Sequence, residues 1–243
     1  MTTDGRFARR LDPESRYGLR LTLFALALVL VAVPFGFLLD QVARSGPLTR
    51  ADTSAAEHLH DWVRRSPGVV GPLRVVTFLG ATAWLAVVVA ATAAYTLARG
   101  RRRLAVFVVV TALAGGVLNT AVKVTVDRQR PVLDPPVATA GGYSFPSGHA
   151  AASTVSYGAV TLALLPAVPR RRRRATVAGV VVLVAAIGAS RLALGVHYLT
   201  DVLGGFALGS GHPRAMTPAG RPDAVSGTLA DDSLRLGTSR STG

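Results

Sequence analysis

The apolar residues of this chain are gathered in six blocks, rather than spread in the periodic stripes typical of a water-soluble protein. The blocks cover residues 21–39, 75–98, 104–126, 150–167, 175–194 and 196–210. About 18 or more apolar residues in a helix, at about 1.5 Å per residue, cross a hydrocarbon layer roughly 30 Å thick. The pattern predicts an all-α, polytopic membrane bundle of about six spans. The last span is short, since its run of about 15 residues corresponds to roughly 22 Å.

Polar segments divide the rest of the chain. Residues 1–20 are basic, and the block that follows could be a signal peptide, but it is long and lacks a small-x-small cleavage site, which favours an uncleaved span. Residues 40–73 form a polar connection, of which 50–65 fit an amphipathic helix at the membrane surface. Its His58 and His60 are expected to be solvated. The domain assignment is therefore a basic cytoplasmic N-terminus (1–20), a transmembrane domain (21–210) and a disordered tail (211–243) too polar to offset its ordering entropy.

The basic excess fits membrane topology better than nucleic-acid binding. The chain has 27 Lys and Arg against 13 Asp and Glu, a net charge of +14. Most of these residues are Arg and cluster beside the apolar blocks, at 99–103 and 170–174 among other places. With the N-terminus cytoplasmic, these clusters and the tail fall on the cytoplasmic side, as the positive-inside rule requires. There are no cysteines, which excludes disulfides and thiolate metal sites.

This topology brings several reactive residue types to the extracytoplasmic end. Lys123 lies in the last turn of the third block, and Arg130 follows in a loop rich in Pro and Gly. Ser147, Gly148 and His149 open the fourth block; the donors at such a helix start suit an anion. Arg191 ends the fifth block, and His197 and Asp201, four residues apart, share one face of the last helix. A carboxylate there would fix the tautomer of the imidazole.

Simpler interpretations exist for each residue. Lys123 and Arg191 could be anchors that extend to the interface, and Ser147 could be an ordinary helix cap. His197 and Asp201 could form a polar contact between helices or half of a metal site. Three cations beside one carboxylate disfavour a metal ion, because such a field attracts anions. It suits phosphate.

Taken together, the residues resemble a known signature. Lys123, six residues and Arg130-Pro131; then Pro146-Ser147-Gly148-His149; then Ser190-Arg191, five residues, His197, three residues and Asp201 resemble the three-part motif of the type-2 phosphatidic acid phosphatase superfamily. This superfamily includes membrane lipid phosphatases and, more remotely, vanadium haloperoxidases. The resemblance covers roughly 52–209.

The resemblance implies a role for each matched residue. His197 would be the nucleophile that forms a phosphohistidine, Asp201 would orient it, and His149 would be the general acid and then the base. The phosphate would be held by Lys123, Arg130, Ser147, Gly148 and Arg191. No metal or other cofactor is implied.

The sequence therefore predicts a metal-independent lipid phosphatase of the cell membrane, with its active site on the extracytoplasmic side. The substrate would be a lipid phosphate or diphosphate of the undecaprenyl diphosphate, phosphatidic acid or phosphatidylglycerol phosphate type; no nucleic acid is expected as a partner. Two alternatives stay open: a vanadate-dependent haloperoxidase, and a non-catalytic protein that binds or transports lipid phosphates. The pattern predicts neither the preferred head group nor the oligomeric state.

Overall fold

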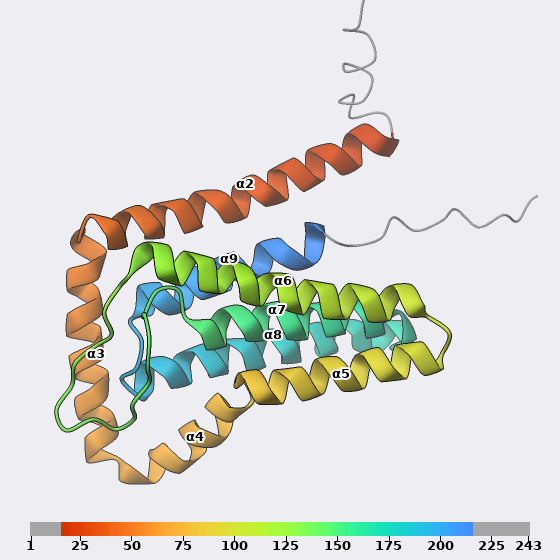
Figure 1. Cartoon of the computed structure of the whole chain (residues 1–243). Coiled ribbons are helices and arrows are strands. Elements are labelled where there is room, and N and C mark those ends of the chain that lie inside the picture. The colour runs from red at the N-terminus through yellow and green to blue at the C-terminus, as the bar shows by residue number, and fades with distance from the viewer. Residues whose placement is uncertain (1–15, 216–243) are drawn as a thin grey trace, which may run out of the picture.

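The computed structural model describes residues 16–215, and over that range the chain is helical, with no strand (Figure 1). The elements are α2 (Arg16–Ala43), α3 (Pro47–Arg65), η1 (Pro67–Val69), α4 (Val70–Phe78), α5 (Thr82–Ala98), α6 (Arg102–Val126), α7 (Gly148–Leu164), η2 (Leu165–Ala167), α8 (Arg170–Ala193) and α9 (Leu199–Ala215). Each of the six apolar blocks coincides with helix, so the predicted all-α bundle is confirmed. The rest of the predicted N-terminal segment and tail lies outside the described residues.

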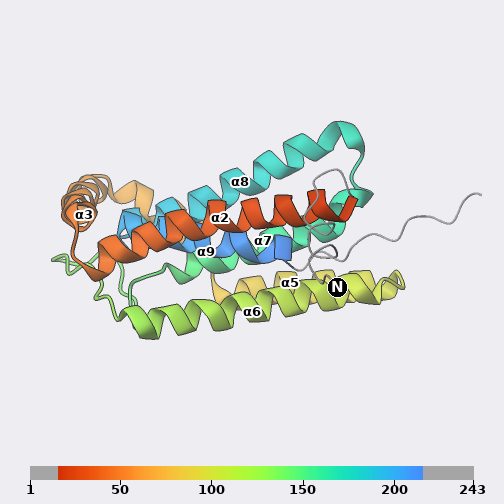
Figure 2. The same cartoon turned by 90° about the horizontal axis from the view of Figure 1, so that it is seen from above.

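The long helices run side by side, and α3 crosses one end of the bundle (Figures 1 and 2). The loop between α6 and α7 and the turn between α8 and α9 lie at this same end. The two turns that carry the arginine clusters, α5–α6 and α7–α8, lie at the opposite end. The bundle thus separates its arginine-rich end from the end at which the predicted site residues gather.

Three helices in the described part of the chain, α6, α7 with η2, and α8, are long and apolar enough to cross a membrane. The second apolar block, predicted as one span, is instead divided: η1 with α4 and α5 meet at an angle of 42° and together can form a fourth span. The break contains Gly80, where an added Cβ would lie 2.5 Å from Ile187 and 3.2 Å from His149. The bend therefore brings backbone directly against α8 and the start of α7.

The last helix differs from the prediction at both ends. It begins at Leu199, so His197 precedes it, and it continues beyond the predicted end at residue 210 to Ala215, inside the predicted tail. Its 17 residues correspond to about 25 Å. Gly209 does not end the helix because its missing side chain serves packing: an added Cβ would lie 2.6 Å from Thr154 and 2.9 Å from the Ala151 carbonyl of α7.

Helix α3 confirms the predicted amphipathic helix but corrects the prediction for one histidine. Its inward face buries Asp52, Ala56, His60 and Val63 against the bundle, whereas His58 is exposed as expected. His60 is only 4% exposed. It was expected to be solvated because its neighbours in sequence are polar, but those neighbours lie on the other face of the helix.

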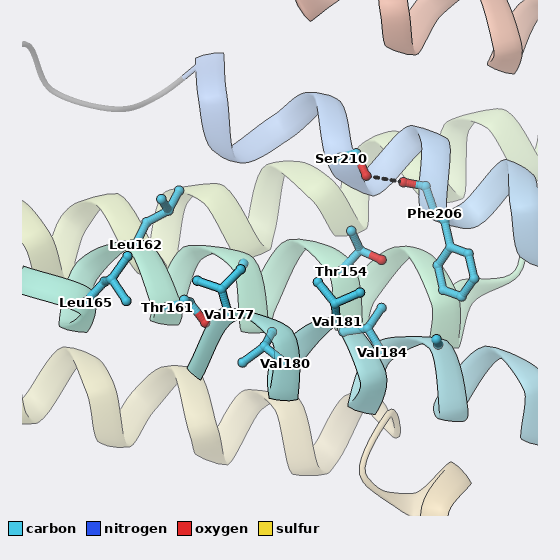
Figure 3. A pocket seen from close by; sticks show the side chains of 12 residues that line it. Thr154, Thr161, Leu162, Leu165, Val177, Val180, Val181, Val184, Phe206 and Ser210 are labelled. Atoms are coloured by element: carbon cyan, nitrogen blue, oxygen red, sulfur yellow. Dashed lines mark hydrogen bonds between the residues drawn. The ribbon is translucent and has the colours of Figure 1, made fainter. Parts of the chain in front are cut away.

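An apolar groove of about 470 Å³ lies among α7, α8 and α9 (Figure 3). Valines of α8 line one wall, and Thr154 and Leu162 of α7 line another together with Leu165 of η2. Phe206 of α9 also lines it, and the ring of this residue packs on Gly188 together with the buried Val202.

Candidate active site

The beginning of α7 presents a buried hydroxyl and free backbone donors. Ser147 is the N-cap residue, yet its side chain makes no capping hydrogen bond, and its Oγ is buried without a partner. Its backbone N–H donates to the Asp201 carbonyl at 2.8 Å, which ties the start of α7 to the start of α9. Gly148 and His149 follow in the first turn, where the N–H groups have no partner within the helix.

Lys123 lies at the end of α6, as the sequence predicts. The helix ends at Asp127, which adopts a left-handed conformation. The Nζ of Lys123 donates to the Tyr143 carbonyl at 2.6 Å and is 3.4 Å from the Ser144 carbonyl. The α6–α7 loop is thereby folded back over the end of its own helix.

Arg130 joins this loop to the turn before α9. Its Nε and Nη2 donate to the carbonyls of Gly142 at 2.9 Å and Gly141 at 3.0 Å. Its Nη1 donates to the Val196 carbonyl at 2.7 Å and lies 3.0 Å from Nε2 of His197. A guanidinium is thus placed directly beside the imidazole that the resemblance assigns to nucleophilic attack.

Arg191, in the last turn of α8, supplies the third cation. Its side chain is held by α4, because Nη1 donates to Oγ1 of Thr77 at 2.9 Å. Its Nε is buried and has no hydrogen-bond partner.

Polar atoms without partners gather around the start of α7. Besides Oγ of Ser147 and Nε of Arg191, Oδ1 of Asn119 on α6 is buried and unpaired. An added Cβ on Gly148 would lie 3.6 Å from Asn119 and 3.8 Å from Lys123, so these side chains border the helix start. A buried polar group without a partner costs about 1–3 kcal/mol. Such a concentration is typical of a site built for a polar ligand, and the surrounding charges favour an anion.

His197 and Asp201 form a pair, but with a geometry that differs from the prediction. His197 lies in the turn before α9, and Asp201 lies in the first helical turn, so the two do not share a helix face. Nδ1 of His197 is 3.3 Å from Oδ2 of Asp201, which also accepts the Tyr198 N–H at 2.8 Å. This bond from a first-turn carboxylate back to the residue before the helix is one half of a capping box. It aims the carboxylate at the imidazole.

The environment of His197 keeps the ring neutral. The side chain is only 2% exposed. Burial lowers the pKa of His197 to about 4, although the hydrogen bond to Asp201 acts in the opposite direction. With Nδ1–H directed at Asp201, Nε2 carries the free electron pair.

His149, in the first turn of α7, is the second imidazole of the site. Its ring lies within electrostatic reach of the cations Arg191, Arg130 and Lys123 and of His197. Each of the predicted site residues therefore lies at the same end of the bundle. Within residues 16–215, no three His, Asp or Glu side chains are arranged to hold a metal ion.

Sequence reasoning missed a second layer of polar residues behind Asp201. Arg128 bridges two buried carboxylates: Nη1 is 2.7 Å from Oδ1 of Asp201, and Nη2 is 2.9 Å from Oδ2 of Asp52. Ser144 also donates its hydroxyl to Asp201, and Thr200 donates its hydroxyl to Asp52. Arg128 could have been noticed because it lies two residues before Arg130. Asp52 carries no such signal, because it lies in a polar segment of the sequence.

Comparisons with known proteins find relatives of this chain in sequence and in fold. A family model described as the PAP2 superfamily matches residues 103–217. Phosphatidylglycerophosphatase B of Bacillus subtilis (strain 168) is 38% identical over 96 residues, which cover 38% of this chain and 46% of that protein. The match thus spans about half the length of this curated relative.

The fold is also shared with a solved structure. The crystal structure described as the first transmembrane PAP2 type phosphatidylglycerolphosphate phosphatase from Bacillus subtilis superposes with a TM-score of 0.72. The superposition covers 78% of this chain and 93% of that chain at 24% identity. At this level of identity, the likeness concerns the fold.

Proposed function

We propose that this chain, whose residues 103–217 match the family model of the PAP2 superfamily, is an integral membrane lipid phosphatase that works through a phosphohistidine. The observation that carries the proposal is the meeting of three cations, two imidazoles and unpaired buried polar atoms at one end of the bundle. Phosphoryl transfer depends mainly on positioning and on neutralising charge, and this site offers both.

In the first step, Nε2 of His197 attacks phosphorus and the bond to the lipid oxygen breaks. His149 gives a proton to that leaving oxygen, and the phosphoryl group remains on His197. Asp201 holds Nδ1–H and stabilises the positive charge that the ring acquires. The pair of His197 with Asp201, 3.3 Å apart, supports these roles.

In the second step, His149 takes a proton from water, the oxygen of that water attacks phosphorus, and the bond to Nε2 breaks. Inorganic phosphate leaves and His197 returns to its neutral form. Throughout, Lys123, Arg130 and Arg191 balance the charge on the phosphoryl oxygens. Ser147 and the amide of Gly148 donate to the same oxygens. In this mechanism the cations of the chain take the place that a metal ion has in many phosphatases.

The name of the curated relative makes phosphatidylglycerol phosphate the first substrate to test. Phosphatidic acid and undecaprenyl diphosphate offer the same combination of phosphate head group and lipid tail, so they complete the panel. We place the enzyme in the cell membrane, with a cytoplasmic N-terminus and its active site on the extracytoplasmic side.

The deciding experiment measures phosphate release from these three lipids by detergent-purified protein in the presence of EDTA. We expect turnover by the wild type and none by His197→Ala. His58→Ala is the matched control, because this second histidine is exposed on α3 and should retain full activity. Full activity in His197→Ala would exclude the phosphohistidine mechanism, whereas binding of lipid phosphate with no turnover on any lipid would favour a binding protein.

A further inference from the structure

We infer that Arg128 and Asp52 are positioning residues, which hold Asp201 in place from behind and connect the pair of His197 and Asp201 to the crossing helix α3. The inference deepens the proposed function and rests on it for its effect on turnover. The interactions that carry it lie on the side of Asp201 that faces away from His197.

The carboxylate of Asp201 is fully buried, and its two oxygens have separate partners. Oδ2 receives the Tyr198 N–H and the Ser144 hydroxyl and lies beside His197. Oδ1 receives Nη1 of Arg128 at 2.7 Å. Arg128 therefore fixes the rotation of the carboxylate, which decides how Oδ2 faces the imidazole.

Arg128 is itself held on both sides. The ring of Tyr198 lies against its guanidinium, with 4.2 Å between Cζ and the ring centroid. Nη2 reaches Oδ2 of Asp52 on α3, and Nη1 is also 2.7 Å from Oγ1 of Thr200. The side chain of Arg128 is 12% exposed, so the two ion pairs are largely shielded from water and salt.

Asp52 has a second role as a cap supplied by a distant part of the chain. Its Oδ1 accepts the backbone N–H of Thr200 at 3.0 Å, a donor in the first turn of α9 that has no partner within its own helix. A negative charge at this place also interacts favourably with the helix dipole. Helix α3 thus sets the position of the segment that carries both His197 and Asp201.

The buried cluster of Arg128, Asp52 and Asp201 is net negative, opposite in sign to the cations assigned to the phosphate. Asp52 and Asp201 contribute two negative charges and Arg128 one positive charge, while the charged groups around the pair are Arg130, Arg191 and Lys123. Arg128 directs its Nη groups to the two carboxylates and Thr200, whereas Arg130 directs one of its Nη groups at the reactive nitrogen. Two arginines separated by one residue therefore face in different directions and serve different ends.

The test uses Arg128→Gln, Arg128→Lys and Asp52→Asn in full-length protein, with phosphatidylglycerol phosphate in detergent micelles. We expect kcat to fall about 10- to 100-fold, as for other residues that orient a reacting group, with KM nearly unchanged. Asp61→Asn is the matched control, because it removes a carboxylate from the same helix, and the ion pair of Asp61 with Arg65 is exposed to solvent. It should leave turnover unchanged.

A second measurement separates positioning from a general loss of structure. Removing the Arg128 cation makes the neighbouring groups easier to protonate, so the acid limb of the kcat/KM profile should move to higher pH in Arg128→Gln but not in Arg128→Lys. Dividing each kcat/KM profile by the wild-type profile cancels the contribution that ionisation of the substrate makes to both. A melting temperature in the same detergent identifies variants that fail to fold, and Arg128→Lys keeps the charge in case Arg128→Gln is one of them.

The inference can also be examined without turnover. If the wild type hydrolyses none of the lipids, the proposed function fails, but the NMR titration of the His197 ring still reports on its neighbours. A titration that shifts to higher pH in Arg128→Gln, and is unchanged in Asp61→Asn, supports the positioning role on its own. If Arg128→Gln and Asp52→Asn both kept the kcat, the acid limb and the His197 titration of the wild type, the inference would be overturned.

Discussion

The hydroxyl of Ser147 is buried at a cost to the free protein, and the proposed mechanism would give it a partner. Its Oγ is buried at the start of α7 with no partner, although a serine at this position ordinarily caps the helix. The free protein gains nothing from the hydroxyl and loses its hydration. A phosphoryl oxygen would supply the missing partner.

Ser147→Ala should therefore separate stability from activity. We expect a melting temperature equal to or above that of the wild type, because an unsatisfied buried group of about 1–3 kcal/mol is removed. We also expect kcat to fall by about 10²-fold, the low end of the loss from removing one transition-state donor. Thermal unfolding and phosphate release are measured on the same preparation.

Ser153→Ala is the matched control, since Ser153 is buried on the same helix but donates to the His149 and Ala150 carbonyls. It should lose some stability and keep its turnover. Equal activity of Ser147→Ala and the wild type would exclude a role for this hydroxyl in the reaction.

The two kinds of site residue differ in how well sequence predicts them. Lys123, Arg130 and His197 belong to spaced motifs with costly charges near apolar blocks, so their gathering could be predicted. Asp52 lies in a polar segment, where a carboxylate is ordinarily solvated at little cost in free energy and so does not by itself indicate a functional site. Its role depends on α3 crossing the bundle end next to α9, and residue spacing within either helix does not contain that relation.

At the scale of elements, close contact between α7 and α9 keeps the two halves of the site together. Gly204, Gly205 and Gly209 allow the approach: at Gly205 an added Cβ would lie 2.7 Å from the Ser147 carbonyl and 2.8 Å from the Ala150 side chain. The sequence predicted both helices but placed the end of the last one at residue 210, directly after Gly209, whereas α9 continues to Ala215. Glycine in a membrane helix serves packing as often as termination, and only the neighbouring helix decides between the two.

Gly205→Ala should push α9 away from α7, because the obstacle is backbone and cannot rotate aside. We expect a loss of about 1–3 kcal/mol in stability, as for other overpacked positions, and a lower kcat because Ser147 and Asp201 move apart. Thermal unfolding and turnover in detergent test both effects. Gly179→Ala on α8, where an added Cβ meets nothing within 4 Å, should show neither effect.

The inward face of α3 makes a separate prediction about stability. Both ring nitrogens of His60 are buried without partners. His60→Leu should therefore stabilise the protein by about 1–3 kcal/mol, which corresponds to an increase of several degrees in melting temperature. His58→Leu, at an exposed position of the same helix, should change the melting temperature little. A large decrease for His60→Leu would show that the imidazole has a partner in the native protein.

At the scale of the whole molecule, the arginine clusters of the polar turns and the candidate active site lie at opposite ends of the bundle. The arginine clusters lie near the α5–α6 and α7–α8 turns, at the opposite end of the bundle from α3 (Figure 1). The positive-inside rule then orients the bundle with its site outward. This orientation was predicted from the arginines alone and remains to be tested.

The absence of cysteines makes that test direct, because one cysteine can be added to an unmodified chain. Val132→Cys places a thiol in the α6–α7 loop at a residue that is 95% exposed. In intact cells, a membrane-impermeant maleimide should label Val132→Cys but not Arg171→Cys. After permeabilisation of the cells, it should label both variants. The opposite pattern in intact cells would reverse the topology.

The bond between Asp52 and Thr200 joins residues 148 positions apart in the chain. During synthesis, α3 therefore leaves the ribosome long before Thr200 is made, so Asp52 cannot form this bond until the chain is nearly complete. In the proposed mechanism, His197 is oriented only when Asp201 of the last helix has entered. A ribosome-bound chain that ends before α9 would carry His197 and all the residues proposed to bind phosphate, but it would lack Asp201 and Thr200. We therefore expect it to be inert, so that activity arises at the end of translation rather than gradually along it.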